Sequence, residues 1–228
     1  METITANLSF LLSGFQLTLK LAGLAILFSF FLGTFLGVLR NSSRPYLSYP
    51  ASIYIEVIRG TPLIMVIFWI FFLVPIIFSR PIEAFFSALI SLTLFTSAYI
   101  AEIIRAGLRS VPQGQIESGR ATGLNEAQVM LYIVLPQALR NMLPALVSQF
   151  IALFKDTSLA YIIGVVELTR AATIVNNREY RSFVIFGFVA LLYFVCCYGL
   201  SLVARMLERR QARQMGGQRF ADIIQQLT

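Results

Sequence analysis

Histidine is absent from this 228-residue sequence, and lysine occurs only twice. Without histidine, the chain lacks the side chain most used for acid–base catalysis near neutral pH and the imidazole ligands of many metal sites. A P-loop for ATP requires a Gly-Lys pair followed by serine or threonine, but Lys20 stands between two leucines and Lys155 between Phe154 and Asp156. The chain therefore cannot hydrolyse ATP by that route, and we expect it not to be an enzyme. Any uphill transport would draw its energy from a gradient or from another subunit.

Cysteine and charge are also scarce. The only cysteines, Cys196 and Cys197, are adjacent within an apolar segment, where we expect small packing residues and neither a disulfide nor a metal site. Charged residues make up 13% of the chain, whereas an ordinary soluble domain contains about 25%. Hydrophobic residues make up 57%, and the mean hydropathy is +0.77. One globular core cannot hide so much apolar surface, so the composition predicts an integral membrane protein.

Apolar runs long enough to cross a bilayer recur along the chain. About 20 apolar residues in a helix span the hydrocarbon core of roughly 30 Å. We therefore predict an all-α fold with five transmembrane helices, at 21–39, 60–79, 84–101, 141–166 and 182–204. Residues 1–205 then form a single transmembrane domain, and 206–228 form a polar tail. The first positive charge is Lys20, so no signal peptide with a basic start is expected, and the first helix stays in the mature protein.

The positive charges fall unevenly on the two sides that alternating helices would define. One side receives twelve arginines: Arg40, Arg44, Arg59, Arg105, Arg109, Arg120, Arg140, Arg205, Arg209, Arg210, Arg213 and Arg219. The other side receives four: Arg80, Arg170, Arg178 and Arg181. By the positive-inside rule the twelve face the cytoplasm, which places the N-terminus outside and the C-terminus in the cytoplasm. The net charge of +7 is thus interpreted as a topology signal and not as a nucleic-acid surface.

The longest cytoplasmic segment, at about 106–137, has the pattern of two short helices. Gly123 suits the left-handed position that ends the first helix. Asn125, with Gln128 three residues later, resembles a capping box that opens the second. Pro136 disfavours helical geometry at Leu135, so we expect it to mark the junction with the next membrane helix.

The same segment resembles the EAA loop of permease subunits in binding-protein-dependent ABC importers. That motif is Glu-Ala-Ala, three residues, Gly, nine residues and Ile-x-Leu-Pro. The positions that match it are Glu117, Gly123, Ile133, Leu135 and Pro136. The chain departs from it at Ser118 and Gly119, where the family usually has two alanines, but both residues are small and the helix is still expected to pack tightly. The resemblance implies that these seven residues couple the permease to an ATPase, and the alternative is an incidental helical hairpin.

Three further segments resemble recurring segments of the polar amino-acid branch of that family, at 59–63, 101–107 and 155–159. Each is weak alone and has a structural alternative. Arg59 to Pro62 can be a basic anchor followed by a helix start with a proline in its first turn. Glu102 and Arg105 are three residues apart and can pair on one helical face at the membrane boundary.

Lys155 and Asp156 are charged residues inside an apolar segment. If Arg140 lies at the inner interface, Asp156 lies about 24 Å further along the helix, in the outer half of the bilayer. Ionisable groups at that depth usually face a cavity or a partner, and adjacent residues point about 100° apart, so these two cannot easily satisfy each other. The hydroxyls of Thr157 and Ser158 can accompany a break in the helix. These four residues are therefore candidates for the solute path, with structural pairing across helices as the alternative.

The first predicted span contains Gly33 and Gly37 in G-x-x-x-G spacing. This spacing allows another helix to approach closely, either within the chain or in a second subunit. At the other end of the span, Lys20 is expected to snorkel toward the outer interface.

The resemblance covers almost the whole chain and implies a type I ABC importer permease of the bacterial inner membrane, with polar amino acids of the histidine, glutamate or glutamine type as substrates. The implied partners are two cytoplasmic ATPase subunits that use ATP and Mg²⁺, a second permease of the same or a different kind, and an extracytoplasmic binding protein. This chain itself then binds no cofactor. A gradient-driven amino-acid carrier or channel is the alternative function.

Overall fold

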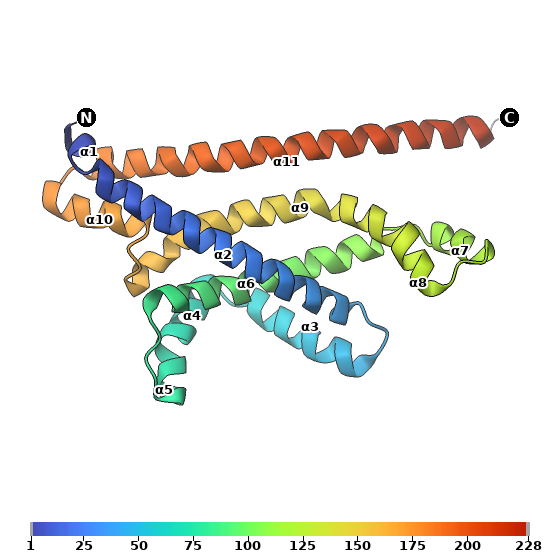
Figure 1. The fold of residues 1–228 in the computed structure, drawn as a ribbon, viewed down its shortest axis with the longest axis horizontal. Helices are drawn as coiled ribbons and strands as arrows, with labels where there is room; N and C mark the ends of the chain where they lie inside the picture. Colours follow the sequence, from blue (N-terminus) through green and yellow to red (C-terminus); the bar gives the residue numbers. More distant parts are fainter. Residues whose placement is uncertain (1, 227–228) are drawn as a thin grey trace.

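The computed structural model describes residues 2–226, and in this part of the chain every regular element is a helix. The helices run lengthwise beside one another in an elongated bundle (Figure 1). α1 (Glu2–Ala6) and α10 (Leu168–Glu179) lie at one end of the bundle, and α7 (Gln113–Ala121) and α8 (Glu126–Gln128) lie at the opposite end. The prediction of an all-α protein is confirmed.

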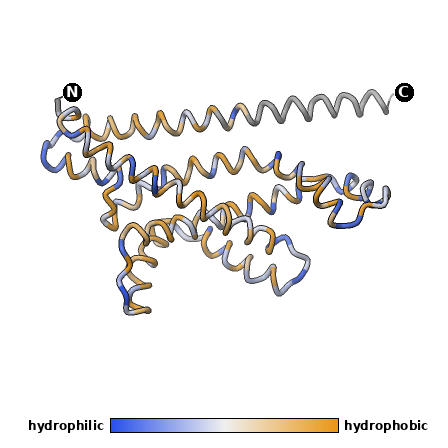
Figure 2. The backbone as a smooth tube through the Cα atoms, viewed as in Figure 1, coloured by the Kyte–Doolittle hydropathy of each residue, from blue (hydrophilic) through white to orange (hydrophobic). Residues whose placement is uncertain are grey.

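Within the described residues, four helical segments are long and apolar enough to cross a membrane: Leu8–Arg40, Ala84–Arg109, Glu126–Ile163 and Ser182–Met206. The bent pair Pro45–Arg59 and Leu63–Phe78, whose arms meet at 106°, supplies a fifth crossing if it counts as one span. These segments correspond in order to the five predicted spans. Figure 2 shows hydrophobic residues along the bodies of these helices, whereas hydrophilic residues gather near the turns.

The first span, α2 (Leu8–Arg40), starts well before its predicted start at residue 21. The prediction stopped there because Lys20 interrupts the uncharged run. One lysine does not interrupt the helix, since a long side chain can place its charge away from the apolar face. The Lys20 ammonium lies 5.5 Å from the centroid of the Phe85 ring. Phe85 belongs to α6 (Ala84–Arg109), so the cation–π contact joins the two helices.

The second span is broken. α3 (Pro45–Arg59) precedes the predicted start at residue 60, and the second arm consists of α4 (Leu63–Phe68), the π-helical segment η1 (Trp69–Leu73) and α5 (Val74–Phe78). Pro62 is the N-cap residue of α4, so a helix does begin at the proline as predicted. The sequence did not reveal α3 because its prolines, serines and Glu56 leave no uncharged apolar run.

The fourth span also differs from its prediction. α8, the π-helical segment η2 (Val129–Val134) and α9 (Leu135–Asp156) follow one another directly, so the second short helix of the cytoplasmic segment is not a separate element. Leu135, directly before Pro136, has right-handed helical geometry with φ −60° and ψ −44°, so the expectation that Pro136 disfavours a helix at Leu135 is wrong. A 3₁₀ segment, η3 (Thr157–Ile163), follows α9, and α11 (Ser182–Gln226) is the last helix. The side chains of the predicted tail beyond Met206 lie outside the described part of the chain.

Gly33 and Gly37 lie where α2 crosses α6. A Cβ atom at Gly33 would lie 2.6 Å from the Cβ of Ile100, and one at Gly37 would lie 2.7 Å from the Ala101 carbonyl oxygen. Only a glycine therefore permits this approach of the two backbones. The partner of the G-x-x-x-G surface is a helix of the same chain.

Candidate functional site

The segment between α6 and α9 reverses direction at Gly123. This glycine has φ +89°, in the left-handed region that favours glycine. The Leu124 amide donates to the Gly119 carbonyl at 3.2 Å, and the Gly123 amide donates to the Arg120 carbonyl at 3.0 Å. These are the two hydrogen bonds of a Schellman motif, which satisfy carbonyl groups at the end of α7. The prediction that Gly123 ends the first helix is confirmed by this geometry.

α8 opens with the capping box predicted from Asn125 and Gln128. The Gln128 amide donates to Asn125 Oδ1, and the Asn125 amide donates to Gln128 Oε1, both at 2.9 Å. Beside the box, Arg120 Nε and Nη2 donate to the two carboxylate oxygens of Glu126 at 2.8 and 3.0 Å. This carboxylate raises the pKa of Arg120. Because the pair is exposed, it orients the turn and adds little to stability.

The residues that occupy the Glu-Ala-Ala positions differ in exposure. Gly119 is buried, and a Cβ atom there would lie 2.3 Å from Ile133 Cδ1. Glycine in place of the usual alanine therefore lets α7 approach Ile133 more closely. Ser118 and Glu117 are exposed, and the Ser118 hydroxyl donates to the Gly114 carbonyl at 2.8 Å. The structure thus brings Gly119 and Ile133 together and leaves Glu117 and Ser118 on the outer face of the hairpin.

The helical hairpin formed by α7 and α8 is fixed to both membrane helices beside it. Asn141 Nδ2 of α9 donates to the hydroxyl of Ser110, which follows α6, at 2.8 Å. Gln137 of α9 donates to the side chain of Gln115 in α7. Ile116 of α7 and Leu124 of the turn pack against an apolar cluster that α6, η2 and α9 share: Ile100, Ile104, Val111, Val129, Val134, Ala138, Met142 and Leu146. The hairpin is therefore in contact with the apolar residues that α6 and α9 share.

An apolar surface lies next to the hairpin on η2. Met130, Leu131 and Tyr132 are consecutive, and all three side chains are exposed. Runs of exposed apolar residues on a protein surface commonly mark contact sites for other proteins or lipid. No sequence motif singled out these residues, because their apolar character is indistinguishable from that of the membrane spans.

The α-helix does end near Thr157, where the sequence suggested a break: α9 ends at Asp156, and the 3₁₀ segment begins at Thr157. The Thr157 hydroxyl is buried and donates to the Phe154 carbonyl at 2.6 Å. Lys155 is exposed, and Asp156 and Ser158 are half-buried. Among the side chains that the structure describes, no ion pair joins Lys155 to Asp156. Three of the four predicted path residues are therefore accessible, while Thr157 stabilises the bend.

A buried carboxylate that the sequence did not single out lies just beyond this bend. Glu167 is completely buried, and its carboxylate accepts hydrogen bonds from the amides of Thr169 and Arg170 at 2.9 Å, as the N-cap of α10. The hydroxyl of Tyr193 lies 3.3 Å from it, and that of Thr18 lies 3.5 Å from it. Glu167 thus ties α10 to α2 and α11. Its position directly after the uncharged segment 157–166 could have singled it out in the sequence.

The predicted pair of Glu102 and Arg105 is part of a larger cluster. Arg105 Nε donates to Glu102 Oε1 at 2.8 Å. Arg40 Nη1 of α2 lies 2.8 Å from Glu102 Oε2, and Arg59 Nη1 of α3 lies 3.7 Å from the same oxygen. Arg40 also pairs with Glu56 of α3 at 2.9 Å. The sequence predicted the local pair and missed the other contacts, because they join residues far apart in the chain.

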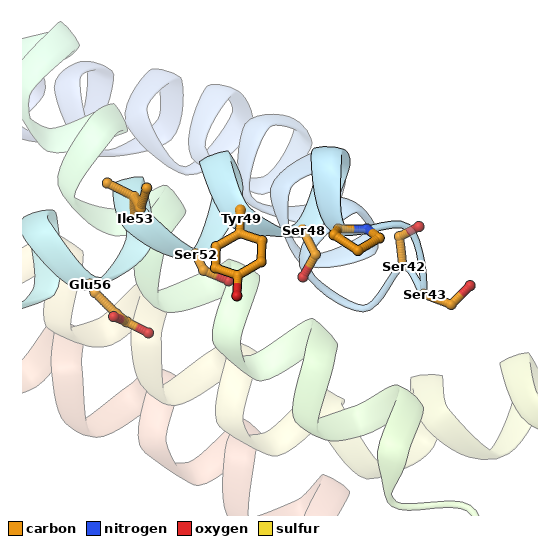
Figure 3. Close-up of a pocket in the computed structure, with 8 residues that line it drawn as sticks. Ser42, Ser43, Ser48, Tyr49, Ser52, Ile53 and Glu56 are labelled. Carbon is orange, nitrogen blue, oxygen red and sulfur yellow. The ribbon is translucent and has the colours of Figure 1, made fainter.

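A surface hollow of about 450 Å³ lies along α3 and the turn before it. Figure 3 shows the hydroxyl groups of the lining residues on one side of α3 and the Glu56 carboxylate at the end of the row. The lining residues are Ser42, Ser43, Pro45, Ser48, Tyr49, Ser52, Ile53 and Glu56. Hydroxyl groups and apolar side chains both line the hollow, and through Glu56 it adjoins the charged cluster around Glu102.

The chain resembles known transport proteins over nearly its whole length. The family described as "Binding-protein-dependent transport system inner membrane component" matches residues 25–213. The probable glutamine ABC transporter permease protein GlnP of Bacillus subtilis (strain 168) is 46% identical over 208 residues, which cover 90% of this chain and 95% of that protein. The glutamate/aspartate import permease protein GltK of Escherichia coli O6:H1 is 35% identical over 218 residues, with 92% and 97% covered.

Solved structures give the same result. An amino acid ABC transporter crystallised with histidines matches with a TM-score of 0.86 and 38% identity, covering 91% of this chain and 96% of that chain. An inward-facing form of the MetNI methionine ABC transporter shares the fold, with a TM-score of 0.73 and 23% identity over 89% and 96% of the two chains. The chain is therefore a multi-pass inner-membrane protein that belongs to the family of binding-protein-dependent transport system inner membrane components, the permease subunits of ABC importers.

Proposed function

We propose that this chain is the membrane-spanning subunit of an ATP-driven importer for polar amino acids, and that the α7–α8 hairpin couples it to separate ATPase subunits. The observation that carries the proposal is the hairpin itself. Two of the EAA-like positions shape this hairpin: Gly123 adopts the left-handed conformation at its turn, and Gly119 allows close contact with Ile133. The relatives named for glutamine and for glutamate/aspartate support a polar amino acid as the solute.

The coupling surface consists of the exposed Glu117 and Ser118 on α7 and the apolar residues on η2 beside them. An ATPase subunit that holds this surface would move the hairpin when its own nucleotide sites close. Because the Gln137–Gln115 hydrogen bond ties α7 to α9, and residues of the hairpin pack against the apolar cluster shared by α6 and α9, both membrane helices would move with it. The conformation of the hairpin is proposed to depend on the other EAA-like residues: Gly119, Gly123, Ile133, Leu135 and Pro136. The chain would thus contribute a gated path and no covalent chemistry.

The solute path is proposed to pass the end of α9. Lys155, Asp156 and Ser158 are accessible there, and a carboxylate beside an ammonium group can meet both charges that every amino acid carries. Irregular backbone at membrane depth is tolerated where it faces protein or water, and the 3₁₀ segment that begins at Thr157 is irregular in this sense. Half-helix ends at such breaks are common solute sites in transporters.

The full assembly is proposed to contain two permeases of the type I fold, two ATPase subunits with ATP and Mg²⁺, and an extracytoplasmic binding protein. The twelve-to-four distribution of arginines supports a cytoplasmic position for the hairpin and for the tail at 206–228. The N-terminal end of the chain then lies outside. α1 and the hairpin are at opposite ends of the bundle, which is compatible with this orientation (Figure 1).

The test is to purify the permease with its ATPase and to measure ATP hydrolysis after addition of binding proteins loaded with glutamine, glutamate or histidine. We expect copurification of the two subunits and stimulation of hydrolysis by at least one loaded binding protein over its empty form. A permease that binds no ATPase, and that moves amino acids down an ion gradient when reconstituted alone, would contradict the proposal. That result would favour a gradient-driven carrier.

A further inference from the structure

The charged cluster around Glu102 lies where α2, α3 and α6 meet. The Glu102 side chain is 20% exposed, and arginines from all three helices surround it: Arg40, Arg59 and Arg105. With Glu56, the cluster contains three positive and two negative charges. One partly buried carboxylate thus joins the ends of three helices. The proposed function assigns no part to this cluster.

Arg59 and Glu56 are the members of the cluster that belong to the broken span, and Arg59 is the one next to the break. It is the last residue of α3, directly before Gly60, Thr61 and Pro62, where the chain turns by 106° into α4. The Arg59 guanidinium lies 5.4 Å from the centroid of the Tyr99 ring and 3.7 Å from the Glu102 carboxylate. Both of these partners are on α6. Arg59 therefore ties the break in the second span to α6.

The backbone at the break does not itself fix the angle between the two arms. The amides of Gly60 and Thr61 donate back into α3, to the carbonyls of Glu56 and Ile58 at 2.9 and 3.2 Å. The Thr61 hydroxyl also donates into α3, and Pro62 has no N–H to donate. The angle between α3 and α4 therefore depends on side-chain contacts with neighbouring helices, and we name the break at Gly60 to Pro62 the α3–α4 hinge. The contacts between this span and α6 include the Arg59 pair and the Tyr54 hydroxyl, which donates to the Leu94 carbonyl at 2.9 Å. They also include an apolar cluster of Ile55, Ile58, Val66, Ala98 and Ala101.

We propose that Glu102 is a positioning residue for transport. It holds Arg59 and thereby fixes the α3–α4 hinge in one of the two arrangements between which the permease alternates. The Arg59–Glu102 contact is the one that opens when the hinge moves. The inference rests on the proposed function, because the two arrangements are those of an ATP-driven transport cycle.

The geometry of the cluster makes this contact the one that can open. At 3.7 Å it is the longest ion pair of Glu102, and the Arg59 side chain is 40% exposed, so water can solvate the guanidinium after separation. Arg40 and Arg105 remain on the carboxylate, so opening leaves no buried charge without a partner. A buried carboxylate that loses every partner is strongly destabilising, whereas the loss of one exposed contact costs little.

The experiment uses the complete complex with Thr61→Cys as a reporter at the hinge, after replacement of Cys196 and Cys197 by alanine. The rate of labelling by a membrane-impermeant thiol reagent is measured without nucleotide and in an ATP-trapped state. In the same preparations, hydrolysis with and without loaded binding protein and the midpoint of thermal unfolding are measured. The test variant is Arg59→Gln, and the matched control is Arg44→Gln, at the opposite end of the same helix.

We expect Arg59→Gln to shift the nucleotide-free labelling rate toward the ATP-trapped value by about tenfold, as when a minor conformation becomes a major one. Basal hydrolysis should rise relative to stimulated hydrolysis, and the unfolding midpoint should stay near that of the parent. Arg59→Lys keeps the positive charge, so its labelling rate and its ratio of basal to stimulated hydrolysis should lie closer to those of the parent. Arg44→Gln should match the parent in both. Unchanged labelling and coupling in Arg59→Gln would overturn the proposal, as would a lowered midpoint with unchanged labelling. A parent complex whose hydrolysis is not stimulated by loaded binding protein would contradict the proposed function. The labelling rates of the parent and of Arg59→Gln would still test the hinge contact in that case.

Discussion

Gly123→Leu is predicted to disable the coupling hairpin through the backbone alone. Gly123 has φ +89°, and a Cβ atom built there meets no neighbouring atom within 4 Å. The leucine side chain therefore has space, and its only cost is the left-handed conformation, about 1–2 kcal/mol for an L-residue. A change of this size alters the equilibrium between the native turn and other turns by a factor of about 5 to 30. The Schellman hydrogen bonds should be lost in a substantial fraction of molecules.

The assay compares copurification with the ATPase, hydrolysis stimulated by the binding protein, and uptake in proteoliposomes. We expect Gly123→Leu to reduce all three, Gly123→Asn to have a smaller effect because asparagine tolerates this region better, and Glu117→Lys to weaken docking by reversing a charge. Gly114→Leu is the matched control, since a Cβ there also meets nothing within 4 Å and its φ is not positive. Normal values for Gly123→Leu and for Glu117→Lys would refute the coupling assignment.

Three further predictions follow from other parts of the chain. In a variant without native cysteines, Asn7→Cys and Gln218→Cys should be labelled from opposite faces of the membrane, because the arginine distribution predicts that the two ends lie on opposite sides; labelling from one face would disprove the predicted topology. Asp156→Asn should slow uptake while the complex still assembles, because the charge at the end of α9 is proposed to meet the solute; wild-type uptake would remove Asp156 from the path. Gly37→Leu should lower the midpoint of thermal unfolding, because its Cβ would lie 2.7 Å from the Ala101 carbonyl oxygen and overpacking costs about 1–3 kcal/mol; Gly23→Leu, with no neighbour within 4 Å, should not.

Local sequence patterns predicted the features that depend on neighbours in the chain. The left-handed turn at Gly123 and the capping box at Asn125 each need only a few adjacent residues, and both are present. The ion pair of Glu102 with Arg105 is likewise a contact one helical turn apart. The apolar runs located the spans in the same way, although the start of the first helix was placed too late because Lys20 interrupts its run.

Contacts between distant segments could not be predicted in this way. Glu102 pairs with Arg40 and Arg59 because three helices converge, and no spacing in the sequence encodes that convergence. The partner of Gly37 stayed open for the same reason, since the G-x-x-x-G spacing describes one surface and not the helix that meets it. Glu167 was missed because its hydrogen-bond donors belong partly to α2 and α11.

The most direct test of the central claim is uptake of a labelled polar amino acid by proteoliposomes that contain the permease, its ATPase and a loaded binding protein, with no ion gradient across the membrane. The account predicts uptake that requires ATP on the side of the α7–α8 hairpin and the binding protein on the opposite side, and no uptake by the permease alone. Uptake that persists without the ATPase, or that follows an imposed ion gradient and ignores ATP, would contradict it.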